Sequence, residues 1–428
     1  MSQAKEVRKL FLDFFAKRNH KIVPSSSLIP IDDPSVLLTT AGMQQFKKYF
    51  TGEKDALKDF GTQRTCSVQK CFRTTDIEEI GDERHLTFFE MLGNFSFGPV
   101  GKDDPSDFND KSGYFKNSAI YWAYEFLVKE LGLKIDYVTI FKGEDKIPYD
   151  QTSYQIWKDI GFDDKNIKEF GREDNFWGPT GDEGPCGPTT EIYIDNIEIW
   201  NLVFNEYYQD KNKKLIKLKN PGVDTGMGLE RLMKVVEKKE TIFETSLFLP
   251  LKEIIFDQRI DLEIRKYRII ADHLRGAVFL ISDGLYPSNL ERGYILRRIL
   301  RRLVLYLKLS RLNLDIIGKL VKVVIENYKD FYPEINNYDK IINVIDKEVR
   351  IFEKTLMRSL AKFDKIIKIN DAYEEIGEKL FLLFSSYGLP LEIAKEIFKE
   401  RNWNWDNKIE EVFNKKYREH QKLSKGNG

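Results

Sequence analysis

The stretch Val223-Asp224-Thr225-Gly226-Met227-Gly228-Leu229-Glu230-Arg231 carries the most information about the fold of this chain. Two glycines two positions apart precede a Glu-Arg pair, and an apolar helical pattern follows. Glycine lets a backbone approach a ligand closely, and arginine supplies a planar cation that can bind phosphate or stack on a base. On its own, a Gly-x-Gly pair is equally typical of a tight turn between a strand and a helix. The wider sequence has to decide between a ligand site and a plain turn.

A second informative segment lies earlier in the chain. The runs Cys71 to Asp76 and Arg84 to Met91 flank a short, turn-like segment through Gly81-Asp82. This pattern predicts two antiparallel strands joined by a loop. A period of two places four side chains on one face of the second strand: His85, Thr87, Phe89 and Met91. Such a face, with an aromatic ring beside polar groups, could stack a nucleobase.

The chain has 428 residues, more than the ~250 to 300 at which a single hydrophobic core usually stops growing. Up to about residue 245, strand-like runs alternate with helical stretches and Gly/Pro-rich loops, which is typical of an α+β domain. From residue 246 onward a 3.6-residue periodicity dominates. We therefore predict an α+β domain over residues 1–245 and an all-helical domain over residues 246–428. The polar stretch Pro99 to Gly113 is predicted to be a surface insertion rather than an ordered element, with no catalytic role.

Composition excludes several classes of protein. Lys+Arg and Asp+Glu balance at 68 each, so the net charge neither supports nor excludes an RNA partner. The three cysteines and four histidines show no close pairing, which argues against zinc and disulfides and favours a reducing, cytoplasmic setting. The sequence contains no run of ~18 apolar residues, so it predicts no membrane span. The sequence also contains neither His-Ile-Gly-His nor Lys-Met-Ser-Lys-Ser, nor the Gly-x-x-x-x-Gly-Lys phosphate loop.

Taken together, the segments resemble the class II aminoacyl-tRNA synthetases. Phe72-Arg73 and His85-x-x-x-Phe89 look like their motif 2, and Gly226-x-Gly228-x-Glu230-Arg231 looks like their motif 3. Within class II, longer runs resemble the alanyl-tRNA synthetase family: Thr87 to Gly98, Gly184 to Pro188, Glu198 to Asn201, Val223 to Arg231, and Pro287-Ser288-Asn289 with Arg292-Gly293-Tyr294. The resemblance implies an antiparallel sheet flanked by helices, followed by an all-α domain that recognises the tRNA acceptor stem.

The resemblance also implies a ligase that activates L-alanine with ATP and Mg²⁺ and transfers it to the 3′ end of tRNA(Ala). Arg73 would contact the α-phosphate, and Phe89 and Arg231 would enclose the adenine, with His85 and Gly228 in the same ATP site. Arg73 and Arg231 would be the catalytic residues. The attack of a carboxylate on phosphorus needs two anions oriented and charge dispersed, which suits arginine and Mg²⁺.

A pocket for alanine is implied by the same resemblance. Asp224 would pair with the α-ammonium group, and Gly226 would lie against the substrate. Met91, Trp177, Asn201 and Val203 would form the walls of the pocket. Without the resemblance, Asp224 is equally a capping or turn residue, and Met91 and Trp177 are ordinary core residues. Glu198 is a candidate Mg²⁺ ligand, although strict alternation sends it and Asn201 to opposite faces unless the strand contains a bulge.

Recognition of tRNA is expected from the helical pattern of residues 291–308. Four arginines crowd into less than two turns, where they repel each other unless anions neutralise them; they are Arg297, Arg298, Arg301 and Arg302. The resemblance places this helix and Arg292 against the acceptor stem, and it makes Asn289 a reader of the G·U pair. The family partner of Asn289 is an aspartate, whereas this chain has Ser385, which puts the usual mode of G·U selection in doubt.

Two further departures from the family concern the loop between the motif 2 strands and the end of the chain. The loop lacks the longer Gly/Lys-containing segment of many relatives. Because the metal-binding motifs of the editing domain and the C-terminal dimerisation domain are absent, we expect no editing activity and a monomer. Two other functions compete with this interpretation: a class II relative that charges an acceptor other than tRNA, and a non-catalytic tRNA-binding module. The arginine-rich helix argues against the first, and the intact ATP motifs argue against the second.

Overall fold

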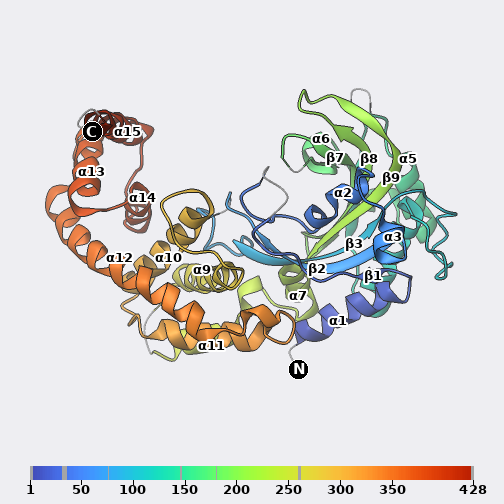
Figure 1. The fold of residues 1–428 in the computed structure, drawn as a ribbon, viewed down its shortest axis with the longest axis horizontal. Coiled ribbons are helices and arrows are strands. Elements are labelled where there is room, and N and C mark those ends of the chain that lie inside the picture. The colour runs from blue at the N-terminus through green and yellow to red at the C-terminus, as the bar shows by residue number, and fades with distance from the viewer. Residues whose placement is uncertain are drawn as a thin grey trace.

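A nine-stranded sheet forms the centre of the N-terminal half of the molecule (Figure 1). The computed structural model describes residues 3–30, 36–75, 77–144, 147–179, 181–258 and 262–425. Within these ranges the strands follow the order β1-β2-β3-β9-β8-β7-β4-β5, and β6 pairs with β7. Their bounds are β1 Lys21–Ile22, β2 Arg64–Phe72, β3 Phe88–Ser96, β4 Tyr137–Phe141, β5 Ile167–Phe170, β6 Phe176–Trp177, β7 Gly184–Ile194, β8 Ile197–Gln209 and β9 Leu215–Gly228.

The predicted pair of antiparallel strands is confirmed as β2 and β3, but its predicted bounds were wrong, because β2 ends at Phe72 and β3 begins at Phe88. Cys71 pairs with Phe89, and the ladder continues to Arg64 opposite Ser96. On its other side, β3 pairs with β9, which places Met91 opposite Gly228 and Phe95 opposite Asp224. Helix α7 (Leu229–Val236) begins directly after β9, so the Gly-x-Gly stretch does form a strand-to-helix turn. The two segments that resemble motifs 2 and 3 are therefore hydrogen-bonded neighbours.

Helices cover the face of the sheet that lies opposite Asp224 and Asn201. Helix α1 (Gln3–Ala16) buries Phe11 and Phe15, whose rings lie near Trp200 of β8. Beside it are α4 (Lys116–Tyr124) and the π-helical turn η2 (Glu125–Glu130). The remaining short helices of this half are η1 Gly42–Phe46, α2 Lys47–Phe50, α3 Ala56–Phe60, α5 Gln151–Ile160, η3 Asp164–Asn166, α6 Arg172–Asn175 and η4 Ile242–Glu244. This apolar layer fixes one side of the sheet, so the opposite side is left for ligands.

Beyond Gly228, the described chain contains helices but no strand. The helices are α8 Leu249–Phe256, α9 Ile264–Ser282, α10 Glu291–Leu309, α11 Ile316–Tyr328, η5 Pro333–Ile335, α12 Tyr338–Ile366, α13 Tyr373–Tyr387, α14 Leu391–Glu400 and α15 Asn407–Lys425. Phe352, Leu356 and Phe363 are buried along α12, as the periodicity predicts. None of the described helices is both long enough and apolar enough to span a membrane.

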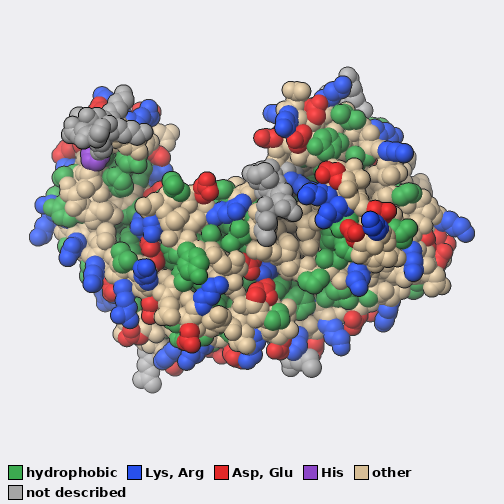
Figure 2. All heavy atoms as spheres, viewed as in Figure 1, with side chains coloured by type: hydrophobic (Ala, Val, Ile, Leu, Met, Phe, Trp, Pro, Cys, Tyr) green, Lys and Arg blue, Asp and Glu red, His purple; other side chains and the backbone are tan. Residues whose placement is uncertain are grey.

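Helix α9 links the two halves of the molecule. It is buried along nearly its whole length and contacts β3 on one side and α10 on the other. Figure 1 shows α9 and α10 between the sheet and α12, with α13 to α15 at the far end. In the space-filling view, the surface is hollowed between these C-terminal helices and the sheet-containing half (Figure 2).

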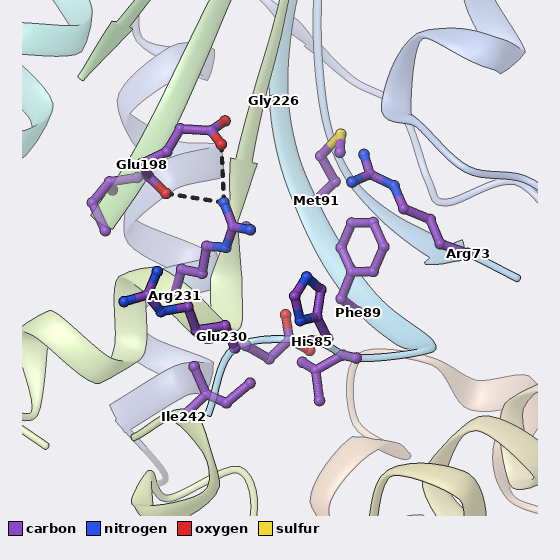
Figure 3. Close-up of a pocket in the computed structure, with 13 residues that line it drawn as sticks. Arg73, His85, Phe89, Met91, Glu198, Gly226, Glu230, Arg231 and Ile242 are labelled. Carbon is purple, nitrogen blue, oxygen red and sulfur yellow. Dashed lines mark hydrogen bonds and ion pairs between the residues drawn. The ribbon is translucent and has the colours of Figure 1, made fainter. Parts of the chain in front are cut away.

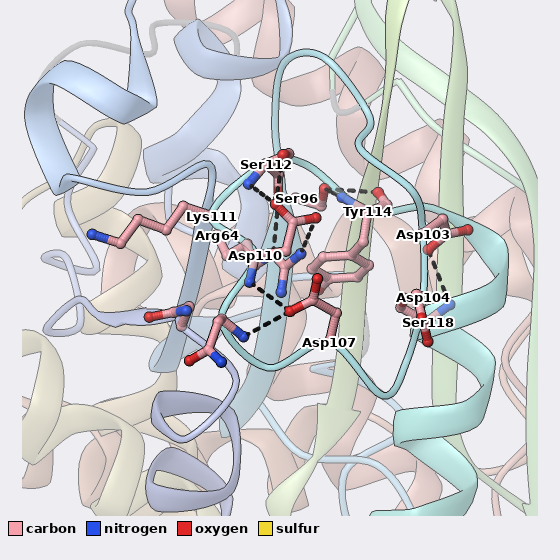
Figure 4. Close-up of polar contacts among 12 residues, drawn as sticks. Arg64, Ser96, Asp103, Asp104, Asp107, Asp110, Lys111, Ser112, Tyr114 and Ser118 are labelled. Carbon is pink, nitrogen blue, oxygen red and sulfur yellow. Dashed lines mark hydrogen bonds and ion pairs between the residues drawn. The ribbon is translucent and has the colours of Figure 1, made fainter.

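The segment from Pro99 to Gly113 lies largely exposed on the surface, as predicted, but specific polar contacts hold its backbone. Apart from an isolated bridge between Val100 and Gly113 it has no strand or helix, yet its aspartates bind backbone N–H groups (Figure 4). Asp103 accepts hydrogen bonds from Phe115, Asn117 and Ser118 at the start of α4, and Asp110 accepts from Ser112 and pairs with Arg64. These side-chain-to-backbone bonds replace a regular ladder, and composition does not reveal them.

Glycine is required at position 187 because β7 and β8 approach each other closely there. The register between β7 and β8 shifts between Cys186 and Thr189, and at this irregularity the backbone of Gly187 packs on that of β8. A Cβ atom on Gly187 would overlap the carbonyl oxygen of Phe204 and lie 2.8 Å from its carbonyl carbon. Both obstacles are backbone atoms inside the sheet, so neither can move aside easily.

We therefore expect Gly187→Ala to lower the free energy of unfolding by more than about 2 kcal/mol, because it forces two strands apart. Gly228→Ala is the matched control, since a Cβ there meets only Arg231 side-chain atoms at 3.9 Å. Its free energy of unfolding should change by less than about 1 kcal/mol. Urea unfolding followed by circular dichroism measures both, and equal stability of the two variants would contradict this account of Gly187.

Candidate active site

The predicted ATP-site residues line one cavity of about 120 Å³ (Figure 3). The cavity lies where β3, β8 and β9 meet the start of α7. Its lining includes Arg73, His85, Phe89, Met91, Glu198, Gly226, Gly228 and Arg231, together with Arg84, Leu86, Ile199, Glu230 and Ile242. Residues more than 150 positions apart in the sequence are thus collected by strand pairing.

Phe89 stands at the centre of this cavity. The guanidinium carbon of Arg73 lies 4.9 Å from the centre of the Phe89 ring. Arg231 lies on the other side of the ring in Figure 3, and its Nη1 donates to Glu198 Oε2 over 3.0 Å. An aromatic ring with an arginine on each side offers a stacking surface beside two cations that can bind phosphate.

The sequence predicted that His85, Thr87, Phe89 and Met91 share one face of a strand, and the structure shows that they do not. Strand β3 begins only at Phe88, so His85 belongs to the preceding loop, where its Nδ1 lies 2.6 Å from Asp82 Oδ2. Thr87 points away from the cavity, and its hydroxyl donates to Asp272 of α9 over 2.7 Å. Alternation therefore holds for Phe89 and Met91 and fails before the strand begins, where a loop breaks the period of two.

The bulge that Glu198 and Asn201 required is present in β8. Tyr193 pairs with Glu198, while the preceding Ile192 pairs with Trp200, so Ile199 is the extra residue. The bulge turns Glu198 and Asn201 to the same side of the sheet. For these two residues to share a face, the sequence required a bulge, and the structure contains it.

Glu191 is a member of this group that sequence analysis missed. It pairs with Asn201 across the two strands and accepts a hydrogen bond from Asn201 Nδ2 over 3.0 Å. Burial, reinforced by the nearby charge of Glu198, raises the pKa of Glu191 to about 7. The oxygen of the same amide, Asn201 Oδ1, is buried and has no hydrogen-bond partner among the described residues. Only its strand position beside Asn201 could have indicated Glu191.

Asp224 lies inside strand β9, which rules out the alternative roles of helix cap and turn residue. Its neighbours across the sheet are Val203 of β8 and Phe95 of β3. Its side chain is 6% exposed, and in the described part of the chain no group pairs with its carboxylate. Burial raises the pKa of Asp224 to about 7. A buried carboxylate without a partner is costly, and an incoming cation would relieve that cost.

Apolar side chains stand beside Asp224. Phe95, Met91 and Trp177 belong to one small cluster with the aromatic residues of η1 and α2. The backbone at Gly226 lies close to the Met91 side chain. A Cβ atom at position 226 would lie 2.9 Å from Met91 Sδ. Asn201 pairs with Gly226 in the neighbouring strand. Strand pairing and this apolar cluster thus bring together the residues predicted to surround a small substrate.

The arginines of α10 are neutralised by the protein itself. Arg297 and Arg301 both pair with Glu348 of α12, at 3.0 and 3.4 Å. Arg298 pairs with Glu78 in the loop between β2 and β3. These three arginines remain partly exposed.

Arg302 does not lie on the surface, which corrects the prediction for that residue. It is 1% exposed and pairs with Glu396 of α14 at 3.0 Å, and its Nη1 lies 2.9 Å from His273 Nε2. The prediction counted charges along one helix and could not see the carboxylates that neighbouring helices contribute. Asn289 and Ser385 are exposed, and Arg292 is partly exposed and donates to the Pro30 carbonyl.

Comparison with known proteins matches this chain to one family. A model of the family described as tRNA synthetases class II (A) matches residues 6–428. The alanine–tRNA ligase of Rubrobacter xylanophilus is 39% identical over 94% of this chain and 48% of its own length. That of Thermotoga maritima is 40% identical over 99% of this chain and 49% of its own length. That of Borreliella afzelii is 36% identical over 99% of this chain and 73% of its own length.

The chain thus spans about half the length of the first two relatives. Among solved structures, pyrrolysyl-tRNA synthetase from Desulfitobacterium hafniense is similar at 11% identity, with a TM-score of 0.35, over 57% of this chain and 74% of that one.

The raised pKa of Asp224 predicts a specific dependence of stability on pH. Because the folded pKa is about 7 and the unfolded value is ~3.9, the folded state binds this proton more tightly. The contribution of Asp224 to the free energy of unfolding is fully present below about pH 4. It is lost as the pH rises to about 7, by at most ~1.4 kcal/mol per pH unit.

Asp224→Asn removes this contribution. Urea unfolding without substrate, from pH 5 to pH 8, should show the wild type losing stability relative to the variant as the pH rises. Parallel profiles would mean that the carboxylate is ionised throughout this range.

Proposed function

Because the chain belongs to the class II (A) tRNA synthetases, we propose that it activates L-alanine with ATP and transfers the alanyl group to the 3′ end of tRNA(Ala). The observation that carries this proposal is the buried carboxylate of Asp224, which has no partner in the described chain and lies on the same side of the sheet as the arginine-lined cavity. A primary ammonium beside a short apolar side chain fits that position.

For ATP, we assign stacking of the adenine to Phe89 and Arg231. Arg231 would exchange its contact with Glu198 for the base, and Arg73 would leave the Phe89 ring to meet the α-phosphate. His85 and Gly228 complete the lining on the same side. In-line attack of the alanine carboxylate needs orientation of two anions and dispersal of charge, so the two arginines serve as the catalytic residues and no general base is required.

The oxygen atoms around Glu198 fit Mg²⁺. Glu198, Glu191 and Asn201 share one side of the sheet, and Asn201 Oδ1 is a buried acceptor without a partner among the described residues. Two carboxylates and an amide oxygen are hard ligands of the kind that Mg²⁺ prefers. We therefore assign the metal to these three residues, where it would neutralise and orient the phosphates of ATP. The predicted absence of zinc stays a prediction.

Selection of alanine would follow from the small space around Asp224. Met91, Trp177 and Phe95 enclose it on the apolar side, while Val203 and Asn201 border it from β8. A side chain larger than methyl would have to displace packed aromatic groups, which is costly in a dense interior. Glycine would leave part of the space empty and lose contact area.

For tRNA, we propose that residues 246–428 bind the acceptor stem, with residues 1–245 as the aminoacylation domain. Asn289, Arg292 and Ser385 are accessible, and Arg297, Arg298 and Arg301 are partly so. Phosphate groups would compete with Glu348 and Glu78 for these arginines and would position the RNA without reading its sequence. Monomeric state and cytoplasmic location stay predictions.

ATP–pyrophosphate exchange tests the first half of the proposal. Alanine should support exchange with a kcat/KM at least tenfold above those of serine and glycine. Arg73→Ala and Arg231→Ala should each lower this value at least a hundredfold, because each removes a cation from the developing charge. Absence of exchange with any amino acid in the wild type would overturn the assignment and favour a non-catalytic RNA-binding protein.

Charging of tRNA tests the second half. The double variant Arg297→Gln/Arg301→Gln is made in a Glu348→Gln background, so that no buried carboxylate loses its partners. Relative to that background it should lower kcat/KM for tRNA(Ala) about tenfold and leave alanine-dependent exchange within twofold, because lost phosphate contacts weaken only RNA binding. Arg350→Gln is the control, since this exposed arginine lies on α12 and pairs with Asp346 one turn away. Equal loss of exchange and charging in the double variant would contradict the division of labour.

A further inference from the structure

Strand β3 has an unpaired edge beside Phe89. Pairing between β3 and β9 begins at Met91 opposite Gly228, and beyond that pair β9 gives way to α7. No strand of the described chain therefore covers this edge of β3 from Phe88 to Glu90, although Phe88 and Glu90 are fully buried. Buried backbone N–H and C=O groups must find other partners, since leaving them unpaired is costly.

Side chains from two helices supply those partners. The Thr87 N–H donates to Asp272 of α9 over 2.9 Å, and the Phe88 carbonyl accepts from Nη2 of Arg275 over 2.5 Å. The Glu90 N–H donates to Glu230 of α7 over 3.1 Å. The backbone is thus held on both sides of Phe89, the ring that we assign to the adenine.

Arg275 connects these contacts. Its Nη1 lies 3.0 Å from Glu230 Oε1 and donates to the Tyr328 hydroxyl of α11 over 3.0 Å. Its side chain is completely buried, and a Cβ atom on the next residue, Gly276, would lie 3.0 Å from the Phe72 ring. One guanidinium therefore binds a strand carbonyl, a helix carboxylate and a tyrosine at the same time. Glu230, which it holds, directly precedes Arg231.

We propose that Arg275 is a positioning residue for ATP: by binding the Phe88 carbonyl and Glu230 together, it sets the relative position of Phe89 and Arg231. This proposal rests on the ATP site proposed above. It assigns a role in nucleotide binding to a residue of the helical half that does not touch the cavity. The planar fork of arginine is essential, because a lysine ammonium is a single point that cannot reach three acceptors in these directions.

Two variants separate positioning from stability. Arg275→Lys keeps a positive charge beside the buried Glu230, so the fold is retained while the fork is lost. The double variant Glu230→Gln/Arg275→Met removes both charges, so no uncompensated ion stays buried. The control is Arg64→Met, which removes an equally buried arginine from the opposite end of β2, where it pairs with Asp110 and donates to Ser112.

Calorimetric titration of each 428-residue protein with ATP gives Kd, and exchange kinetics give KM for ATP and for alanine. We expect Kd and KM for ATP to rise about tenfold in the double variant and at least threefold in Arg275→Lys, with KM for alanine within twofold. Arg64→Met should change neither ATP value more than twofold, even if its melting temperature falls.

Both ATP values within twofold of the wild type in cooperatively unfolding Arg275 variants would overturn the proposal. An equal rise in Arg64→Met would also overturn it, because general loosening would then explain the effect. Should the wild type bind ATP but support no exchange with alanine, the alanine assignment fails, while the Kd series still decides the role of Arg275.

Discussion

The register between β3 and β9 is the constraint on which the rest of the site depends. It places Met91 opposite Gly228 and Phe95 opposite Asp224. A slip of one residue would turn every side chain of one strand to the other face of the sheet. If β3 slipped, Phe89 would leave the cavity; if β9 slipped, Asp224 would enter the apolar layer under α1. Gly226 permits this register, because Met91 occupies the space that a side chain at position 226 would need.

Internal charge pairing explains why an arginine-rich helix can pack inside the protein. Helix α10 meets carboxylates from three different parts of the chain: Glu348 of α12, Glu396 of α14 and Glu78 of the loop after β2. Removing one partner of a buried pair leaves an uncompensated charge, which is strongly destabilising. Ion pairs consequently join the helical half to this loop, and an RNA phosphate would have to compete with these carboxylates.

Helix α9 makes the two halves of the chain interdependent. Asp272 and Arg275, one turn apart on this helix, bind the backbone on one side of Phe89, while Gly276 allows the helix to approach Phe72 closely. The end of β9 at Gly228 marks the change from strands to helices. It does not mark the end of the site, because side chains of α9, the first long helix after it, bind the backbone at the start of β3, along its unpaired edge.

The sequence by itself determined the antiparallel strand pair, the helical character of the C-terminal half and the strand-to-helix turn at Gly228, because local periodicity and short motifs depend on neighbouring residues. The resemblance to the class II synthetases, and not periodicity, indicated Arg73, Phe89 and Arg231 as neighbours of one site. The sequence also showed that Glu198 and Asn201 could share a face only across a bulge. Only the tertiary structure decided that this bulge exists, that Glu191 joins them, that Thr87 turns to Asp272, and that Arg302 is buried. Each of these depends on a partner from a distant segment, and pairing between distant segments leaves no periodic trace in a single sequence.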